Sequence, residues 1–136
     1  MKDVTHNLDK VIALDFDGCV CSSAWPDVGE PNWDVIQDAK EEQKNGAYII
    51  LWTCREGKLL DDAVKACREW GLELDGVNES LPQWIEKWGS ATRKIGATEY
   101  WDDRAYNPVN PYITPFDMMP AYRQGYIKGR KRGLFL

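Results

Sequence analysis

The chain has 136 residues and a formal net charge of −5, with 43% hydrophobic and 29% charged residues. This length and composition are typical of one folded domain, here residues 1–136, and they exclude a disordered chain. The longest apolar run, residues 47–52, is too short to span a membrane, and the first ten residues contain no apolar signal segment. We therefore expect a cytoplasmic protein with free thiols and no membrane contact.

The first predicted element lies in residues 11–20, VIALDFDGCV. Its apolar start shows no polar alternation, so residues 11–16 are expected to form a strand buried on both faces, as in a parallel sheet. Asp15 and Asp17 come at the carboxyl end of this strand, where open α/β sheets bind ligands, and Gly18 allows the chain to turn. A strand that simply ends in an Asp-Gly turn is the competing interpretation.

A loop and a helix are predicted next. Residues 21–31 are rich in Ser, Pro and Gly, and Trp25 among them either packs over the sheet edge or contacts a substrate. Residues 32–45 predict a helix with Asn32 at its N-cap and Gly46 after its end.

Residues 47–52 predict a second buried strand, which ends before Thr53. Strand, helix and strand in this order form a right-handed crossover unit, so Asp15 and Thr53 are expected at the ends of neighbouring parallel strands. Capping of the next helix is the alternative role for Thr53.

The second half of the chain predicts, in order, a helix, a weak strand, an amphipathic helix and a fourth strand. Their expected ranges are residues 58–70, 74–77, 81–88 and 98–101. Trp84 and Trp88 of the amphipathic helix are expected in the core or in a dimer contact. The fourth strand ends in Asp102 and Asp103, which adds two carboxylates at a strand end.

The last segment, residues 108–136, differs in composition from the rest. Its prolines break regular structure, and a short helix is expected over residues 120–131. Five basic residues and no acid follow Asp117, whereas the preceding part holds 22 acids against 12 bases. This basic tail either contacts nucleic acid, an anionic substrate or an acidic surface, or is a solubilising or ion-paired terminus.

Cysteine and histidine usage disfavours two kinds of site. The four cysteines form no C-x-x-C pair, which argues against zinc. The one histidine, His6, lies in the N-terminal tail, which argues against Ser–His and Cys–His nucleophile pairs.

Up to four carboxylates are thus expected to meet at one edge of the sheet. Two like charges about 4 Å apart repel by on the order of 4 kcal/mol at an effective dielectric constant near 20, so the cluster requires a cation. Carboxylate oxygens without His or Cys ligands point to Mg²⁺ as the cofactor, and Lys94 would neutralise further charge.

These residues resemble the motifs of the haloacid dehalogenase (HAD) superfamily, in particular its small phosphatase-like members without a cap domain. The matching positions are Asp15-Phe16-Asp17-Gly18, Thr53, Lys94 and Asp102-Asp103. The resemblance covers residues 11–107 and leaves the segment 108–136 outside. It implies an α/β fold, a three-layer α/β/α sandwich with a parallel Rossmann-like sheet.

The resemblance also implies a function, that of a Mg²⁺-dependent phosphomonoester hydrolase with an aspartyl-phosphate intermediate. Asp15 would be the nucleophile, and Asp17 would protonate the leaving oxygen and later deprotonate water. Thr53 would donate a hydrogen bond to the phosphoryl group, and Lys94 would hold Asp15. The metal ligands would be Asp15, the backbone carbonyl of Asp17 and Asp102, with Asp103 acting through water.

Two departures from the family pattern stand out. Cys19 follows Gly18 where Thr is frequent; a backbone amide there would still bind phosphate, and a thiol beside the site would make activity redox-sensitive. The intervals that hold cap domains in many relatives are filled by the elements above. The resulting open site suits a large substrate or one covered by another subunit, so a homo-oligomer stays an alternative.

Arg55 and Gly18 are the candidate substrate-binding residues, and Arg55 is alternatively an ion-pair partner of Glu56 or Asp61. Thr-x-Arg-Glu at this place also resembles the phosphatase half of polynucleotide kinase-phosphatases. The substrate is therefore expected to be a phosphorylated small molecule or a nucleic-acid 3′-phosphate end. A non-catalytic binding module with the same fold is the alternative of a different class.

Overall fold

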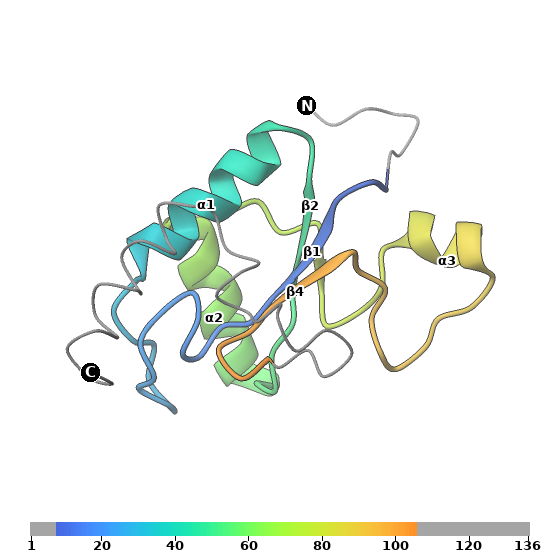
Figure 1. The fold of residues 1–136 in the computed structure, drawn as a ribbon. Coiled ribbons are helices and arrows are strands. Elements are labelled where there is room, and N and C mark those ends of the chain that lie inside the picture. The colour runs from blue at the N-terminus through green and yellow to red at the C-terminus, as the bar shows by residue number, and fades with distance from the viewer. Residues whose placement is uncertain (1–7, 106–136) are drawn as a thin grey trace, which may run out of the picture. The chain divides into compact units, whose positions relative to one another are not determined.

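The computed structural model of the protein describes residues 8–105. Residues 8–102 lie in one compact unit, and this part of the chain holds a four-stranded, all-parallel sheet and three helices (Figure 1). In chain order the elements are β1 (Val11–Leu14), α1 (Trp33–Lys44), β2 (Tyr48–Leu51), α2 (Gly57–Glu69), β3 (Gly76–Val77), α3 (Pro82–Trp88) and β4 (Glu99–Trp101). The predicted α/β fold with a parallel sheet is confirmed, and each predicted helix and strand in this range is present.

The strand order β3-β2-β1-β4 places β1 between β2 and β4. Leu14, the last residue of β1, lies opposite Leu51 of β2 and Trp101 of β4. Because all three strands run in the same direction, the residues that follow them emerge at one edge of the sheet. Asp15 and Thr53 therefore follow two neighbouring parallel strands, as predicted from the order strand, helix and strand.

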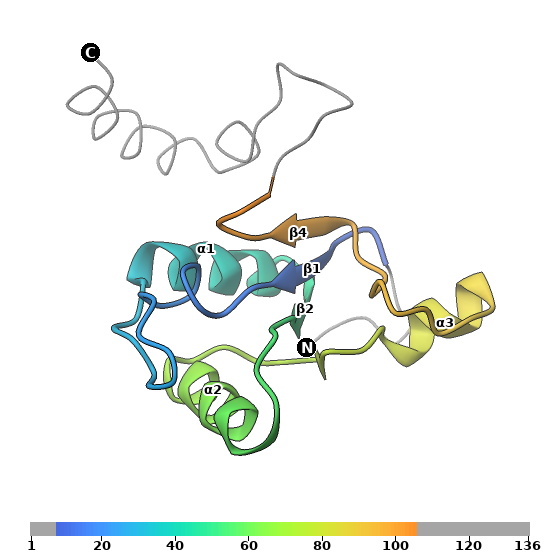
Figure 2. The ribbon, with the colours of Figure 1, turned by 90° about the horizontal axis from the view of Figure 1, so that it is seen from below.

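Alternate residues of β1 face two different apolar clusters, as the period of two in a strand requires. Ile12 and Leu14 pack with residues of α1 and α2, whereas Val11 and Ala13 pack with Leu81, Ile95 and their neighbours. Figure 2 shows α1 and α2 together on one side of the sheet and α3 on the other. Both faces of β1 are thus covered, which explains its unbroken apolar sequence.

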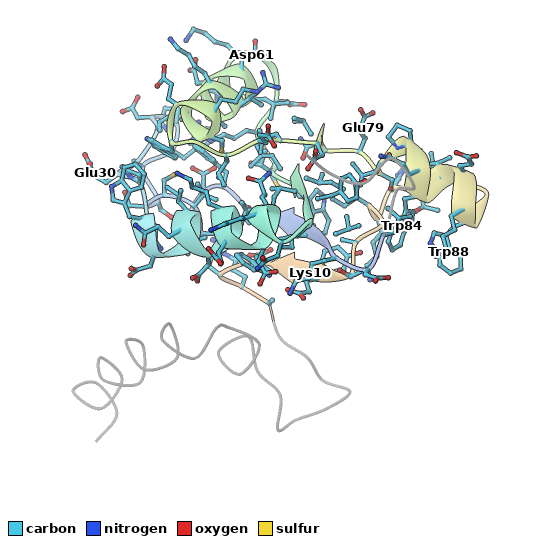
Figure 3. All side chains as sticks on the ribbon, turned by 90° about the horizontal axis from the view of Figure 1, so that it is seen from above. Lys10, Glu30, Asp61, Glu79, Trp84 and Trp88 are labelled. Atoms are coloured by element: carbon cyan, nitrogen blue, oxygen red, sulfur yellow. The ribbon has the colours of Figure 1, made fainter. Side chains whose placement is uncertain are left out.

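The short helix α3 differs from the prediction. Trp88 is 62% exposed, and α3 has no buried residue, so the core role expected for this tryptophan is wrong. Trp84 is half-buried against the second cluster, and its ring lies 6.1 Å from that of Trp88 (Figure 3). The seven-residue helix gains its apolar contact mainly through Leu81, the buried residue at its N-cap. The dimer contact stays a prediction.

The helix α1 begins where the sequence predicts, but for a different local reason. Asn32 occupies the N-cap and makes no side-chain capping bond. Its side-chain N–H instead donates to the carbonyl oxygen of Cys19 at 3.2 Å, which fastens the start of α1 to the turn that follows β1.

No helix in residues 8–105 combines the length and apolar character that a membrane crossing requires. The predicted N-terminal lead-in falls almost wholly outside the described residues, and the proline-rich segment and basic tail lie outside them.

Candidate active site at the carboxyl edge of the sheet

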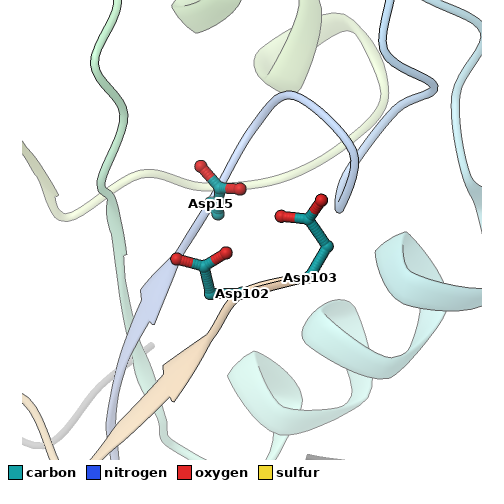
Figure 4. Close-up of side chains that lie close together, drawn as sticks. All are labelled: Asp15, Asp102 and Asp103. Atoms are coloured by element: carbon teal, nitrogen blue, oxygen red, sulfur yellow. The ribbon is translucent and has the colours of Figure 1, made fainter. Parts of the chain in front are cut away.

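The first feature of the site is a group of three carboxylates. The backbone N–H of Asp15 donates to the carbonyl oxygen of Trp101 at 3.0 Å, which holds the end of β1 beside the residue that precedes Asp102. Asp15, Asp102 and Asp103 each offer one carboxylate oxygen, and these oxygens lie within 4.8 Å of one another (Figure 4). The structure thus brings together three of the four predicted metal-binding residues.

The chemistry of this donor set suits a hard divalent cation. All three groups are carboxylates, and Asp15 and Asp102 are half-buried, where the surrounding protein lowers the screening of their charges. Carboxylate oxygens are the ligands that Mg²⁺ prefers. The three negative charges repel one another when no cation is present. A bound divalent cation would reduce this repulsion and so stabilise the close approach of the three acids.

The fourth predicted ligand, Asp17, lies in the turn that follows β1. The carbonyl oxygen of Phe16 accepts hydrogen bonds from the N–H groups of the three residues 19–21, and Gly18 adopts a φ of 83°. Only glycine takes this φ without steric cost, so the prediction that Gly18 permits the turn is confirmed.

The backbone amides of this turn are occupied within it. The N–H of Gly18 donates to the carbonyl oxygen of Cys21 at 3.0 Å, and the N–H of Cys19 donates to that of Phe16 at 3.2 Å. The structure thus shows these amides bonded within the turn, and phosphate binding at Gly18 and Cys19 stays a prediction. The Cys19 thiol is half-buried and lies 3.6 Å from the carbonyl oxygen of Trp101, to which it donates.

Thr53 follows β2 and is held from two sides. Its backbone N–H donates to Oδ1 of Asn78 at 2.8 Å, and its hydroxyl oxygen accepts the backbone N–H of Arg55 at 3.2 Å. Because Glu56 is the N-cap of α2, Thr53 does not cap that helix. A hydroxyl that accepts one bond keeps its own proton to donate, as the predicted contact with a phosphoryl group requires.

Asn78 is a positioning residue that the sequence analysis missed. It follows β3 with a φ of 54°, a conformation that asparagine tolerates better than most residues, and its N–H donates to the carbonyl oxygen of Leu51 at 2.8 Å. The sequence did contain one indication of this role, because asparagine is one of the few residues that readily adopt a positive φ in a turn after a strand.

Arg55 forms an ion pair, which was the alternative to a substrate anchor, and its partner is Asp17. The Arg55 side chain is 1% exposed. Nε and Nη2 donate to the two carboxylate oxygens of Asp17 at 2.8 and 2.7 Å. The hydrogen bond with Asp17 raises the pKa of Arg55, whose guanidinium stays charged. The alternative partners Glu56 and Asp61 are replaced by an acid 38 residues away in the chain.

Lys94 is placed differently from the prediction. Its Nζ lies 5.3 Å from the centroid of the Tyr100 ring, and the residue is exposed. Within residues 8–105, no ion pair joins Lys94 to Asp15. The structure accordingly brings the predicted site residues together in two groups. Asp15, Asp102 and Asp103 form one, and Asp17 with Arg55 forms the other. The Lys94 ammonium group instead contacts the Tyr100 ring.

Comparison with known proteins identified one similar solved structure. No protein-family model matches the chain, and no curated protein matches it. A solved structure, that of a conserved protein coded by a locus of Bacteroides thetaiotaomicron, is 32% identical with a TM-score of 0.64, over 90% of this chain and 91% of that one. The chain belongs to the family of that conserved protein. Shared identity over nearly the full length of both chains shows that this family has a common fold.

Proposed function

We propose that this protein is a Mg²⁺-dependent phosphomonoester hydrolase of the HAD type, with Asp15 as its nucleophile. The observation that carries the proposal is the position of Asp15 and Asp102 within one carboxylate group at the carboxyl edge of a parallel sheet. The two apolar clusters on opposite faces of that sheet are consistent with a three-layer HAD-like arrangement, which is part of the proposal.

Magnesium would be held by the carboxylates of Asp15, Asp102 and Asp103. When bound, it would offset the negative charge of these acids and of the phosphoryl oxygens, which is the main electrostatic requirement of phosphoryl transfer.

The residues of the chain would carry two steps. In the first, a carboxylate oxygen of Asp15 bonds to phosphorus, the bond to the leaving oxygen breaks, and Asp17 gives that oxygen a proton. In the second, Asp17 accepts a proton from water, which attacks phosphorus and releases phosphate and the free Asp15 carboxylate. The Thr53 hydroxyl would donate a hydrogen bond to the phosphoryl group.

Asp17 can serve this role while it is bound to Arg55. A carboxyl group has about four lone-pair sites, and Arg55 uses one on each oxygen. Asp17 would enter the first step with a proton on one of the remaining sites, and this is the proton that the leaving oxygen receives. The side chain of Asp17 is 26% exposed, so its remaining sites can face a leaving group.

The substrate would be a phosphorylated small molecule or a nucleic-acid 3′-phosphate end. The buried position of Arg55 removes one of the reasons for the nucleic-acid alternative, since this side chain is not available to a strand end. The basic tail, the other reason, lies outside the described residues.

Hydrolysis of 4-nitrophenyl phosphate by the full chain, with and without Mg²⁺, tests the proposal. We expect turnover that requires Mg²⁺ and that falls by at least about 10³-fold in Asp15→Asn, because an amide cannot form the aspartyl phosphate. Asp62→Asn is the matched control: it removes a carboxylate from α2 that pairs with Lys58 at the surface. A wild type without turnover on a broad panel of phosphorylated metabolites and 3′-phosphorylated oligonucleotides would favour a binding module.

A further inference from the structure

One buried guanidinium joins the proposed acid, Asp17, to the loop that faces it. Besides its two bonds to Asp17, Arg55 donates from Nη1 to the carbonyl oxygen of Pro26 at 3.1 Å and from Nη2 to that of Asp27 at 2.7 Å. Four hydrogen bonds thus connect this side chain to two segments of the chain that are far from it in sequence.

The guanidinium is also held from the core. Its Cζ lies 5.0 Å from the centroid of the buried Phe16 ring, which stacks on Trp70 at 6.2 Å. A planar group that packs on an aromatic face and donates in its own plane has little freedom to reorient. Arg55 is therefore a fixed point between the core and the two segments that it binds.

The segment on the other side of Arg55 is a closed loop over residues 22–30. The backbone N–H of Ser22 donates to the carbonyl oxygen of Glu30 at 2.9 Å, and the N–H of Glu30 returns a bond to the hydroxyl of Ser22 at 2.9 Å. Within the loop, Trp25 is 66% exposed, which contradicts packing over the sheet edge. The loop presents an exposed indole directly before Pro26, whose carbonyl Arg55 holds.

We propose that Arg55 is a positioning residue that sets the orientation of the Asp17 carboxyl group and couples it to the loop 22–30. The inference rests on the proposed function and adds the device that aligns its acid. When the loop moves, the carbonyl groups of Pro26 and Asp27 move with it and pull the Arg55 guanidinium, which donates to both. The same guanidinium holds Asp17, so its movement changes the two hydrogen bonds that orient the Asp17 carboxyl group. A leaving group that contacts the loop is in this way linked to the proton that Asp17 transfers to it.

Leaving-group dependence distinguishes this role from a merely structural one. 4-Nitrophenolate departs without a proton, whereas the alkoxide of an alkyl phosphate requires one. Lysine at position 55 keeps the charge but cannot donate to both oxygens of Asp17 and to the two loop carbonyls. Because Asp17 also acts as the base of the second step for both substrates, the measurement is the rate of leaving-group release in a single turnover, with enzyme in excess over substrate. We expect Arg55→Lys to lower this rate on the order of 10²-fold for glycerol 2-phosphate and by less than about threefold for 4-nitrophenyl phosphate. Asp17→Asn should show the same selectivity, and Arg68→Lys on the exposed side of α2 should change neither rate.

Equal losses on both substrates in Arg55→Lys, or no loss on either, would overturn the inference while leaving the proposed function intact. A wild type inactive on both would overturn the two together. Hydrogen exchange of the peptide 22–30 in Asp17→Asn provides a second measurement if the Arg55 variant does not fold. We expect its amides to exchange several-fold faster than in the wild type, and unchanged protection would show that the loop and Asp17 are not coupled.

Discussion

The backbone N–H of Asp15 donates a hydrogen bond of 3.0 Å to the carbonyl oxygen of Trp101, and this bond joins the ends of two strands that are far apart in the sequence. It extends the pairing of β1 with β4 by one residue beyond Leu14 and Trp101. The two residues that follow these strand ends, Asp15 and Asp102, are thereby placed side by side. The proposed metal site is thus a direct consequence of strand register.

Substitution of Asp102 tests the metal site without reference to activity. Mg²⁺ that binds only the folded protein stabilises it, by about 2.7 kcal/mol at a concentration 100 times the dissociation constant. We expect the melting temperature of the wild type to rise with added Mg²⁺ and that of Asp102→Asn to stay constant. Asp62→Asn should behave as the wild type does. If added Mg²⁺ does not change the melting temperature of the wild type, the folded chain has no magnesium site.

Thr53 allows a test of the proposed hydrogen bond to the phosphoryl group. Valine has nearly the same shape but neither donates nor accepts, whereas serine keeps the hydroxyl. We expect Thr53→Val to lower kcat on 4-nitrophenyl phosphate roughly 10²-fold and Thr53→Ser to retain activity within a few-fold. Because valine also leaves the N–H of Arg55 without its acceptor, we expect it to cost about 1 kcal/mol of unfolding free energy. Equal activity of the two variants would remove Thr53 from the site.

Lys94 provides the sharpest comparison between sequence and structure. Its ammonium group lies over the ring of Tyr100 at an exposed position, where a cation–π contact contributes about 0.5–1 kcal/mol. We expect Lys94→Ala to change the free energy of unfolding by no more than this amount. If Lys94 holds Asp15 as the HAD resemblance implies, the same variant should lose at least about 10²-fold in kcat. Wild-type activity in Lys94→Ala would show that the motif match at this position is accidental.

The parts of the fold that the sequence predicts are those fixed by local pattern. Unbroken apolar runs identify β1 and β2 because both strands are covered on both faces. The acids after β1 and β4 converge because parallel strands end at one edge, a rule that needs no knowledge of side-chain contacts.

The partner of Arg55 could not be predicted in this way. An arginine after a strand has the same sequence signal whether it faces solvent or an acid 38 residues away, and the loop 22–30 that buries it carries no periodic pattern. The same limit applies to Lys94, since a motif spacing does not fix the path of the turn before β4. Sequence spacing therefore placed three of the carboxylates together, and it did not predict the contacts that the structure shows for Arg55 and Lys94.

Alkaline destabilisation through Cys67 offers a test of the core that is independent of the site. Cys67 is fully buried in α2, and this burial raises its thiol pKa from 9.0 to about 12. The unfolded chain therefore loses the thiol proton at a lower pH than the folded chain. Stability due to the neutral thiol is complete below about pH 9 and decreases as pH rises to about 12, by up to about 4 kcal/mol.

Urea unfolding between pH 8 and pH 11.5 measures this decrease, with Cys67→Ala as the matched variant. Alanine creates a small cavity and lowers the free energy of unfolding at every pH, but it removes the ionisable group. We expect the difference between wild type and variant to shrink as pH rises, and a constant difference would show that Cys67 ionises equally in the folded and unfolded chains. At pH 8, iodoacetamide should modify the exposed Cys54 and spare Cys67.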